Sequence, residues 1–439
     1  MLKSSKVVGG IKGEIIIPGD KSISHRSVII PAISKGTSRI SNILESEDVK
    51  RTINALIKLG VKIEKKDKKL FIYGNGLRSL IKSNKNLYLG NSGTSARLLI
   101  AVLSCQYFDT KITGDSSLSK RPMDRIINPL KMMGGNFLSN NNFLPIVIKG
   151  NRKLKPIRYN LNIPSAQIKS GIILASLHIK GKTQIIEKLL TRNHTEIMLK
   201  TFGANIKINK YPNKKIITLC GQKELKASNI NIPGDFSSAA FFIVLTLLTK
   251  NSSIVLKNIN INPSRTGMVS ILNLMGAKIS FYNKKKYKGE IVGDIHVKNI
   301  KKLKGIKCPM KFNTSAIDEM LLLFLVSSIS KGTSTYKNLE ELNKKESKRL
   351  DWGIKILKMI GIKTKKISNH GIKIYGNPNL KLKKTYRIKS YLKDHRVYMV
   401  SVIAALTLGG KWIINDPDSI KSSFPSFNKL IKKLGGKIN

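Results

Sequence analysis

The residues with the clearest chemical potential open the first expected helix. Lys21, Ser22 and Arg26 follow an expected strand at 13–18 and a two-residue turn. Because residues four apart share one helical face, Ser22 and Arg26 lie on the same side of the helix start. Backbone N–H groups and the helix dipole favour an anion there, and Lys21 and Arg26 add charge-assisted hydrogen bonds. The segment therefore predicts an anion site, with a capped helix and solvated cations as the alternative.

Three later segments repeat this arrangement, with small residues and hydroxyl groups at a strand-to-helix junction. They are Gly90–Arg97, Pro164–Ser170 and Pro233–Ser238. Gly93 has no Cβ, so backbone N–H groups can approach a ligand closely there. Several such openings predict a shared cleft with a strongly positive field, suited to two anionic substrates.

Acidic residues occur among these cations in two segments that could support proton transfer. Asp318 comes shortly before the apolar stretch Met320–Val326, and Glu346 lies between Lys345 and Arg349. A carboxyl group held within an anion clamp can accept or deliver a proton. A salt-bridged surface helix explains the same spacing and remains the alternative.

The net charge alone suggests nucleic acid, but the distribution of the cations does not. The 439 residues include 80 basic and 25 acidic residues, for a formal net charge of +55. Lysine supplies 66 of the basic residues and is spread from end to end, which indicates compositional drift over an ordinary fold. Half of the arginines instead lie in motif-like segments, where a planar fork suits phosphate and carboxylate. These are Arg26, Arg97, Arg121, Arg192, Arg265, Arg349 and Arg396.

Composition and cysteine usage exclude several classes of protein. Hydrophobic residues make up 41%, which excludes a disordered chain. No apolar run approaches the roughly 20 residues of a membrane helix, and the first ten residues lack the apolar stretch of a signal peptide. Cys105, Cys220 and Cys308 are far apart and form no CxxC pair, which argues against a zinc site or disulfide framework. We therefore expect a protein of the reducing cytoplasm with inert thiols and no membrane partner.

A repeat organises the whole chain. Six times a helix-like stretch ends in an apolar residue that is followed by glycine, at intervals of 69 to 85 residues. Each glycine suits the left-handed position after a helix, and a strand is expected to follow it. An apolar helix, a polar turn and a strand precede each glycine, so we predict an α/β protein of six units in globular lobes. The glycines are Gly60, Gly134, Gly203, Gly276, Gly361 and Gly435.

From about residue 10 to the C-terminus, these segments resemble the family of 5-enolpyruvylshikimate-3-phosphate synthases (3-phosphoshikimate 1-carboxyvinyltransferases). The matching motifs are, in order, Pro18–Arg26, Gly90–Arg97, Lys120–Met123, Pro164–Gln167, Lys345–Leu350 and Asp394–Arg396. The resemblance implies a two-lobed inside-out α/β barrel with three βαβαββ repeats in each lobe. It implies an N-terminal lobe at 20–232 for shikimate 3-phosphate, and a C-terminal lobe at 1–19 with 233–439 for phosphoenolpyruvate.

The resemblance also implies a reaction. The enolpyruvyl (carboxyvinyl) group of phosphoenolpyruvate moves to the 5-hydroxyl of shikimate 3-phosphate by addition and elimination, in the shikimate pathway to chorismate and aromatic amino acids. It implies a monomer without metal or organic cofactor, and inhibition by glyphosate in competition with phosphoenolpyruvate. A related family that acts on UDP-N-acetylglucosamine opens with Lys-Asn and often uses a catalytic cysteine. This chain has Lys21-Ser22 instead, and Cys105 lies within an apolar helix.

Site residues follow from the resemblance by position. It implies that Asp318 accepts the proton of the 5-hydroxyl, that Glu346 protonates phosphoenolpyruvate, and that Lys21 contacts both substrates. The implied contacts to shikimate 3-phosphate are Lys21, Ser22, Arg26, Ser165, Ala166, Gln167, Arg192, Asp318 and Lys345. The implied contacts to phosphoenolpyruvate are Lys21, Asn91, Gly93, Arg121, Gln167, Arg349 and Arg396.

Some positions depart from the family pattern. Lys348 stands where aspartate is usual and adds repulsion beside Arg349, while Asn343 replaces a common arginine. Another branch of the family has serine at Ala166 and lysine at Ser422. The alternative of a different class is a basic nucleic-acid-binding protein that retains the fold without activity. Such a protein needs exposed aromatic residues along a basic stripe, and aromatic residues make up only 6%.

Overall fold

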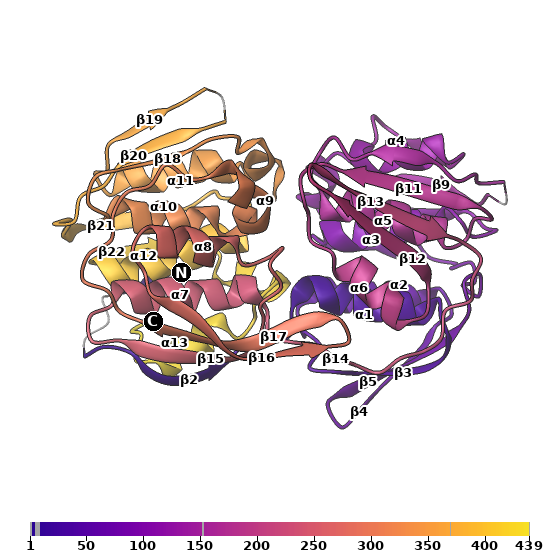
Figure 1. Ribbon diagram of the computed structural model, residues 1–439, viewed down its shortest axis with the longest axis horizontal. Helices are drawn as coiled ribbons and strands as arrows, with labels where there is room; N and C mark the ends of the chain where they lie inside the picture. Colours follow the sequence, from indigo (N-terminus) through magenta and orange to yellow (C-terminus); the bar gives the residue numbers. More distant parts are fainter. Residues whose placement is uncertain (1, 5–8, 152, 369, 439) are drawn as a thin grey trace. The chain divides into compact units, whose positions relative to one another are not determined.

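The computed structural model of the chain describes residues 2–4, 9–151, 153–368 and 370–438. The chain divides into two units (Figure 1). The N-terminal unit comprises residues 19–233 and 286–290, and the C-terminal unit comprises 1–18, 234–285 and 291–439. The sequence expectation placed 286–290 with the C-terminal lobe, whereas these residues group with the N-terminal unit.

The N-terminal unit holds three four-stranded sheets with one topology. The sheet orders are β14-β3-β5-β4, β6-β7-β9-β8 and β10-β11-β13-β12, and in each the first pair is parallel and the other pairs are antiparallel. The strands are β3 (Lys35–Ser41), β4 (Lys62–Lys66), β5 (Lys69–Asn75), β6 (Leu87–Tyr88), β7 (Thr110–Thr113), β8 (Asn136–Ser139), β9 (Ile146–Lys149), β10 (Arg158–Asn160), β11 (Lys182–Glu187), β12 (Asn205–Tyr211), β13 (Lys214–Cys220) and β14 (Ile230–Asn231). The helices are α1 (Lys21–Ala32), α2 (Glu47–Lys58), α3 (Gly93–Leu103), α4 (Asp124–Met132), α5 (Ala166–Ser176) and α6 (His194–Thr201).

The C-terminal unit holds one four-stranded and two three-stranded sheets. Its sheet orders are β16-β17-β15-β2, β18-β20-β19 and β1-β22-β21. The strands are β1 (Leu2–Ser4), β2 (Lys12–Ile16), β15 (Ser253–Asn260), β16 (Ile279–Tyr287), β17 (Glu290–Lys298), β18 (Thr333–Tyr336), β19 (Thr364–Lys366), β20 (Ile372–Tyr375), β21 (Leu382–Ile388) and β22 (Gly409–Ile414). The helices are α7 (Phe236–Leu248), α8 (Gly267–Leu274), α9 (Asn313–Ala316), α10 (Met320–Ser328), α11 (Arg349–Met359), α12 (His395–Leu408) and α13 (Phe427–Lys433).

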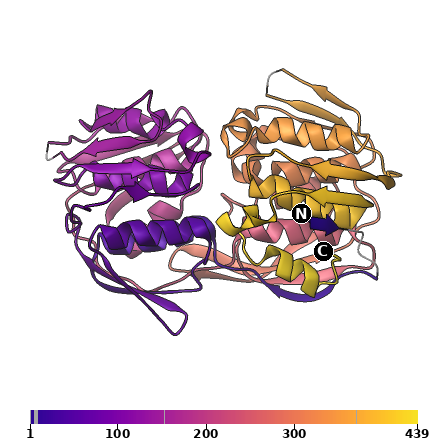
Figure 2. The same ribbon diagram turned by 180° about the vertical axis from the view of Figure 1, so that it is seen from behind.

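Three helices form the centre of each unit and the sheets lie outside them (Figures 1 and 2). In the N-terminal unit α3 packs against α1 and α5, and in the C-terminal unit α7, α10 and α12 pack against one another. Stretches such as Phe241–Leu245 and Met320–Val326 are buried along their whole length. A helix that is apolar on every side must be enclosed, so these stretches determine which helices are central. None of the helices in the described parts of the chain is long and apolar enough to span a membrane.

The six repeat glycines all adopt the left-handed conformation that the sequence predicts. Their φ angles lie between +80° and +102°, directly after the cap residues of α2, α4, α6, α8, α11 and α13. Strands follow the first five glycines. The expectation of a strand after Gly435 is wrong, because the described residues that follow hold only an isolated bridge residue at Ile438. The antiparallel neighbour of β22 is instead β1, where Leu2 pairs with Ile414.

Replacing Gly203 with alanine tests the role of these glycines. Gly203 has φ +83° and no atom lies within 4 Å of an added Cβ, so any loss comes from the backbone alone. We expect Gly203→Ala to lower the free energy of unfolding by about 1 kcal/mol, and Gly203→Asn to lower it less, because asparagine tolerates this conformation better. Urea unfolding of both variants measures this, and equal losses would contradict the explanation.

Candidate active site

The start of α1 carries a lysine and an arginine in contrasting surroundings. Asp20 caps the helix by accepting the N–H of Ile23 at 2.9 Å. Lys21 is partly exposed, and its Nζ lies 2.5 Å from the Asp48 carboxylate. Arg26 lies one turn further along and is only 3% exposed. The expected anion site therefore has one cation at the surface and one inside.

Arg26 is held entirely by uncharged oxygen atoms. Its Nε donates to Thr195 Oγ1 at 2.6 Å, Nη2 to Ser170 Oγ at 2.7 Å and Nη1 to the Ser22 carbonyl at 2.8 Å. Burial lowers the pKa of Arg26 to about 10, so the guanidinium remains charged at neutral pH. The alternative of a solvated cation is wrong, because this charge is buried and positioned.

The opening of α3 brings together residues that the sequence placed around phosphoenolpyruvate. Ser92 caps the helix, and Gly93 is its first residue. Arg121 Nη2 donates to Asn91 Oδ1, and to Ser117 Oγ at 3.2 Å. Arg121 is only 9% exposed, so these two amide and hydroxyl partners orient it inside the unit.

Gln167 links the opening of α5 to that of α3. Its Oε1 accepts from Arg97 Nη1 at 3.0 Å, and its Nε2 donates to Thr94 Oγ1 at 2.9 Å. Ser165 caps α5 and Ala166 is the first helical residue. Arg97 was counted among the motif arginines but was not assigned to the site. A hydrogen bond across 70 positions could not be read from local spacing.

A second cluster of charges surrounds Asp318 in the C-terminal unit. Lys345 Nζ lies 3.3 Å and Arg349 Nη1 lies 3.5 Å from Asp318 Oδ1. Arg396 Nη1 donates to the Asp318 carbonyl at 2.7 Å. Arg349 Nη2 pairs with Glu346. Thus both acids of the predicted clamp contact its cations.

The orientation of Arg349 depends on Asp394, a residue of a matching motif that was given no role. Asp394 is fully buried and accepts Arg349 Nε at 2.8 Å and Ser347 Oγ at 2.8 Å. It also caps α12 by accepting the N–H of Arg396 at 2.9 Å. The alternative of a salt-bridged surface helix around Glu346 is therefore wrong, because Arg349 is only 1% exposed.

Arg349 and Asp394 each favour the charged form of the other. Burial works against the charge of Arg349, but Asp394, Glu346 and Asp318 outweigh burial and raise the pKa of Arg349 above its usual value. Burial works against the charge of Asp394 as well, and Arg349 reverses the effect, so the pKa of Asp394 is lowered. Each group therefore remains charged through the other.

Two residues that depart from the family pattern, Lys348 and Asn343, do not disturb the charges of Arg349 and Asp394. Lys348 is exposed at the cap of α11, whereas Arg349 points inward, so water screens the expected repulsion between them. Asn343 Oδ1 accepts the N–H of Leu350 at 2.8 Å and thereby satisfies the start of α11. The asparagine has a structural use that an arginine side chain would not supply.

Comparison with known proteins gives a consistent result. The family model described as EPSP synthase (3-phosphoshikimate 1-carboxyvinyltransferase) matches residues 6–431. The 3-phosphoshikimate 1-carboxyvinyltransferase of Vesicomyosocius okutanii subsp. Calyptogena okutanii (strain HA) is 44% identical over 427 residues, covering 97% of this chain and 96% of the relative. That of Streptococcus pyogenes serotype M2 (strain MGAS10270) is 42% identical over 429 residues, covering 97% of each.

Solved structures agree with the sequence comparisons. An EPSP synthase from Acinetobacter baumannii has a TM-score of 0.86 and 39% identity, covering 100% of this chain and 99% of that chain. The enolpyruvyl transferase NikO from Streptomyces tendae has a TM-score of 0.76 and 15% identity, covering 100% and 98%. NikO therefore shares the fold with this chain.

The buried imidazole of His25, beside the opening of α1, predicts an effect of pH on stability. Burial, with the charges of Lys21 and Arg26, lowers its pKa well below the usual 6.5. Below about pH 6.5 the unfolded chain takes up this proton first, so the free energy of unfolding falls by up to about 1.4 kcal/mol per pH unit. We expect His25→Asn to flatten the loss between pH 6.5 and 5 in urea unfolding. The control His370→Asn, at an exposed position, should leave it unchanged.

Proposed function

The chain belongs to the EPSP synthase family, and we propose that its two charged clusters bind the two substrates of that family's reaction. As a 3-phosphoshikimate 1-carboxyvinyltransferase, it transfers the carboxyvinyl group of phosphoenolpyruvate to the 5-hydroxyl of shikimate 3-phosphate and releases phosphate. The reaction belongs to the shikimate pathway, which leads to the aromatic amino acids. Nothing in the comparisons supports the nucleic-acid-binding alternative.

Shikimate 3-phosphate is assigned to the N-terminal unit. Arg26 supports this assignment, since a buried guanidinium with only uncharged hydrogen-bond partners keeps its charge for an incoming anionic group. Lys21 and Ser22 stand at the same helix start, and the other proposed contacts are Ser165, Ala166, Gln167 and Arg192 from this unit, with Asp318 and Lys345.

Phosphoenolpyruvate is assigned to the arginines of the C-terminal cluster, with help from the opening of α3. Arg349 and Arg396 both border Asp318. A planar guanidinium suits the carboxylate and phosphate of this substrate. The remaining proposed contacts are Lys21, Asn91, Gly93, Arg121 and Gln167. The lobe boundaries at 20 and 233, a cytoplasmic location and a monomeric state are further proposals.

Asp318 carries the proposed mechanism, because its carboxylate lies beside two cations of the clamp. It takes the proton of the 5-hydroxyl while that oxygen bonds to the middle carbon of phosphoenolpyruvate. Glu346 gives a proton to the terminal methylene carbon, which becomes a methyl group. The methyl group of the resulting ketal phosphate then returns a proton to the Glu346 carboxylate and the double bond re-forms. Phosphate leaves with the electron pair of its C–O bond and takes up the proton that Asp318 holds. Lys21 stabilises the charge that develops on this phosphate.

Phosphate release from shikimate 3-phosphate and phosphoenolpyruvate tests the function, and Asp318→Asn tests the mechanism. We expect the substitution to lower kcat roughly 100- to 10,000-fold because the proton acceptor is lost. The affinity for shikimate 3-phosphate should stay within about tenfold, since no cation is removed. The control Asp351→Asn removes a half-exposed acid from α11 and should leave kcat unchanged. Unchanged turnover in Asp318→Asn would remove this residue from the mechanism.

The position of Gly93 predicts how the enzyme responds to glyphosate. An added Cβ would lie 2.9 Å from Arg97 Nη1 and 3.2 Å from Arg121 Nη1, so both guanidinium groups would have to shift. We expect Gly93→Ala to raise the inhibition constant of glyphosate roughly 10- to 200-fold and the KM for phosphoenolpyruvate much less. Inhibition measured at several phosphoenolpyruvate concentrations compares the two, and equal shifts would contradict this placement.

A further inference from the structure

A buried ionic triad lies next to Arg26, a proposed contact of shikimate 3-phosphate, and has no role in the mechanism. Lys169 Nζ lies 3.0 Å from Glu187 Oε1 and 2.7 Å from Glu196 Oε1. The three residues are at most 1% exposed. Burying three charged side chains carries a large desolvation penalty. Well-packed apolar residues can often replace a buried ion pair or triad without loss of stability. Stability alone therefore gives little reason for this triad.

The triad surrounds the residues that hold Arg26. Ser170, which follows Lys169 on α5, and Thr195, which precedes Glu196 on α6, are both hydrogen-bond partners of Arg26. Ser170 and Thr195 also bond to each other at 2.6 Å. Lys169 and Glu196 are thus one residue away, on each helix, from the atoms that orient the guanidinium.

Glu187 connects the triad to the loop that carries Arg192. Its Oε1 accepts the N–H of Thr191 at 2.7 Å and the hydroxyl of Thr191 at 2.6 Å. The same oxygen faces Lys169, so the lysine is anchored at a fixed point of this loop.

Arg26 is charged, and among the described residues its hydrogen-bond partners are uncharged oxygen atoms. No acid in the described part of the chain lies within ion-pair distance of it, although Glu196 is the carboxylate that acts most strongly on its charge. Glu196 Oε2 is buried without a hydrogen-bond partner, and so is Glu187 Oε2. A buried carboxylate with an unsatisfied oxygen would gain by pairing with a nearby guanidinium.

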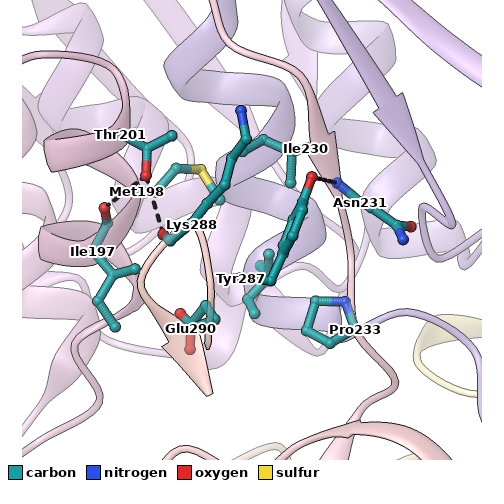
Figure 3. A pocket seen from close by; sticks show the side chains of 10 residues that line it. Ile197, Met198, Thr201, Ile230, Asn231, Pro233, Tyr287, Lys288 and Glu290 are labelled. Atoms are coloured by element: carbon teal, nitrogen blue, oxygen red, sulfur yellow. Dashed lines mark hydrogen bonds between the residues drawn. The ribbon is translucent and has the colours of Figure 1, made fainter. Parts of the chain in front are cut away.

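Glu290, another acid that acts on the charge of Arg26, is engaged in a similar way. Glu290, at the tip of the β16–β17 hairpin, lies 2.6 Å from His194 Nδ1 at the start of α6. Figure 3 shows Glu290 and Lys288 from the hairpin tip beside Ile197 of α6. The acids that act on Arg26 from α6 and from the hairpin tip each contact another basic side chain.

We propose that Lys169 is a positioning residue that engages Glu196 and thereby keeps Arg26 unpaired for an anionic group of shikimate 3-phosphate. Without Lys169, Glu196 turns toward Arg26, and the substrate must compete with a protein carboxylate for that guanidinium. The lysine thus protects the charge of an arginine that it does not touch. This inference rests on the proposed binding of shikimate 3-phosphate at Arg26.

The main test is Lys169→Met, which keeps a long side chain and removes the charge. We expect the dissociation constant of shikimate 3-phosphate, measured by calorimetry, to rise roughly 10- to 100-fold, the worth of a charge-assisted hydrogen bond. At saturating shikimate 3-phosphate, kcat and the KM for phosphoenolpyruvate should stay within about threefold of wild type.

A second substitution separates this role from simple packing. In Lys169→Met/Glu196→Gln the competing carboxylate is gone, so we expect affinity to return to within about threefold of wild type. If Lys169 only stabilises the packing of α5 against α6, the double variant should bind shikimate 3-phosphate as weakly as Lys169→Met or more weakly. The matched control Lys215→Met removes a half-buried lysine that acts on the same glutamates without an ion pair to either, and it should bind normally.

If Lys169→Met does not fold, the single variant Glu196→Gln distinguishes the positioning role of Lys169 from a purely structural one. The proposal expects unchanged or tighter binding of shikimate 3-phosphate, because a carboxylate near Arg26 is removed, whereas a structural tie predicts weaker binding. Wild type that neither binds shikimate 3-phosphate nor releases phosphate overturns the proposed function together with this inference. Wild type that does both, with Lys169→Met binding equally well, overturns this inference alone.

Discussion

The site depends on keeping cations charged after they have been removed from water. Two buried arginines meet this requirement in opposite ways. Arg349 is stabilised by Asp394 and borders two further acids, so its charge is balanced within the protein. Arg26 is satisfied by hydroxyl and carbonyl oxygens and keeps its net charge. We propose that the acids beside the first arginine move protons, whereas the second arginine is held ready for an anionic group of shikimate 3-phosphate.

The fold makes this possible by restricting where polar groups occur. The central helices α1, α3, α5, α7, α10 and α12 are enclosed by apolar neighbours over most of their length. Charged and hydroxyl side chains can be accommodated at the first turns of these helices. The backbone N–H groups there have no acceptor within the helix, so they bond to such side chains. Asp20, Ser92, Ser165 and Asp394 cap four of these helices. Repetition of one unit thus supplies several polar helix starts within an otherwise apolar interior.

Local patterns in the sequence were sufficient to predict the repeat glycines and the polar helix starts. The glycine after each repeat helix was predicted correctly six times, because its requirement for positive φ is set by a single residue. The strand-to-helix junctions at 90–97 and 164–170 were also predicted correctly, and α3 and α5 begin within them. The long-range partners were not predicted. Asp394 contacts Arg349 across 45 positions, and Lys169 contacts Glu187 across 18, so neither pair leaves a local signal. The grouping of 286–290 with the N-terminal unit was missed for the same reason.

The order of the strands has a consequence for synthesis on the ribosome. The N-terminal unit is almost continuous in sequence, and its strand β14 can pair with β3 once residue 231 has emerged. The C-terminal unit begins earlier but finishes last. Lys12 of β2 pairs with Ser253 of β15, and Leu2 of β1 pairs with Ile414 of β22. At about 5–20 residues per second, β2 waits roughly 10 to 50 s for its partner. Until then a nascent chain has an unpaired strand β2 ahead of a unit whose three sheets, which end at residue 231, can already have formed.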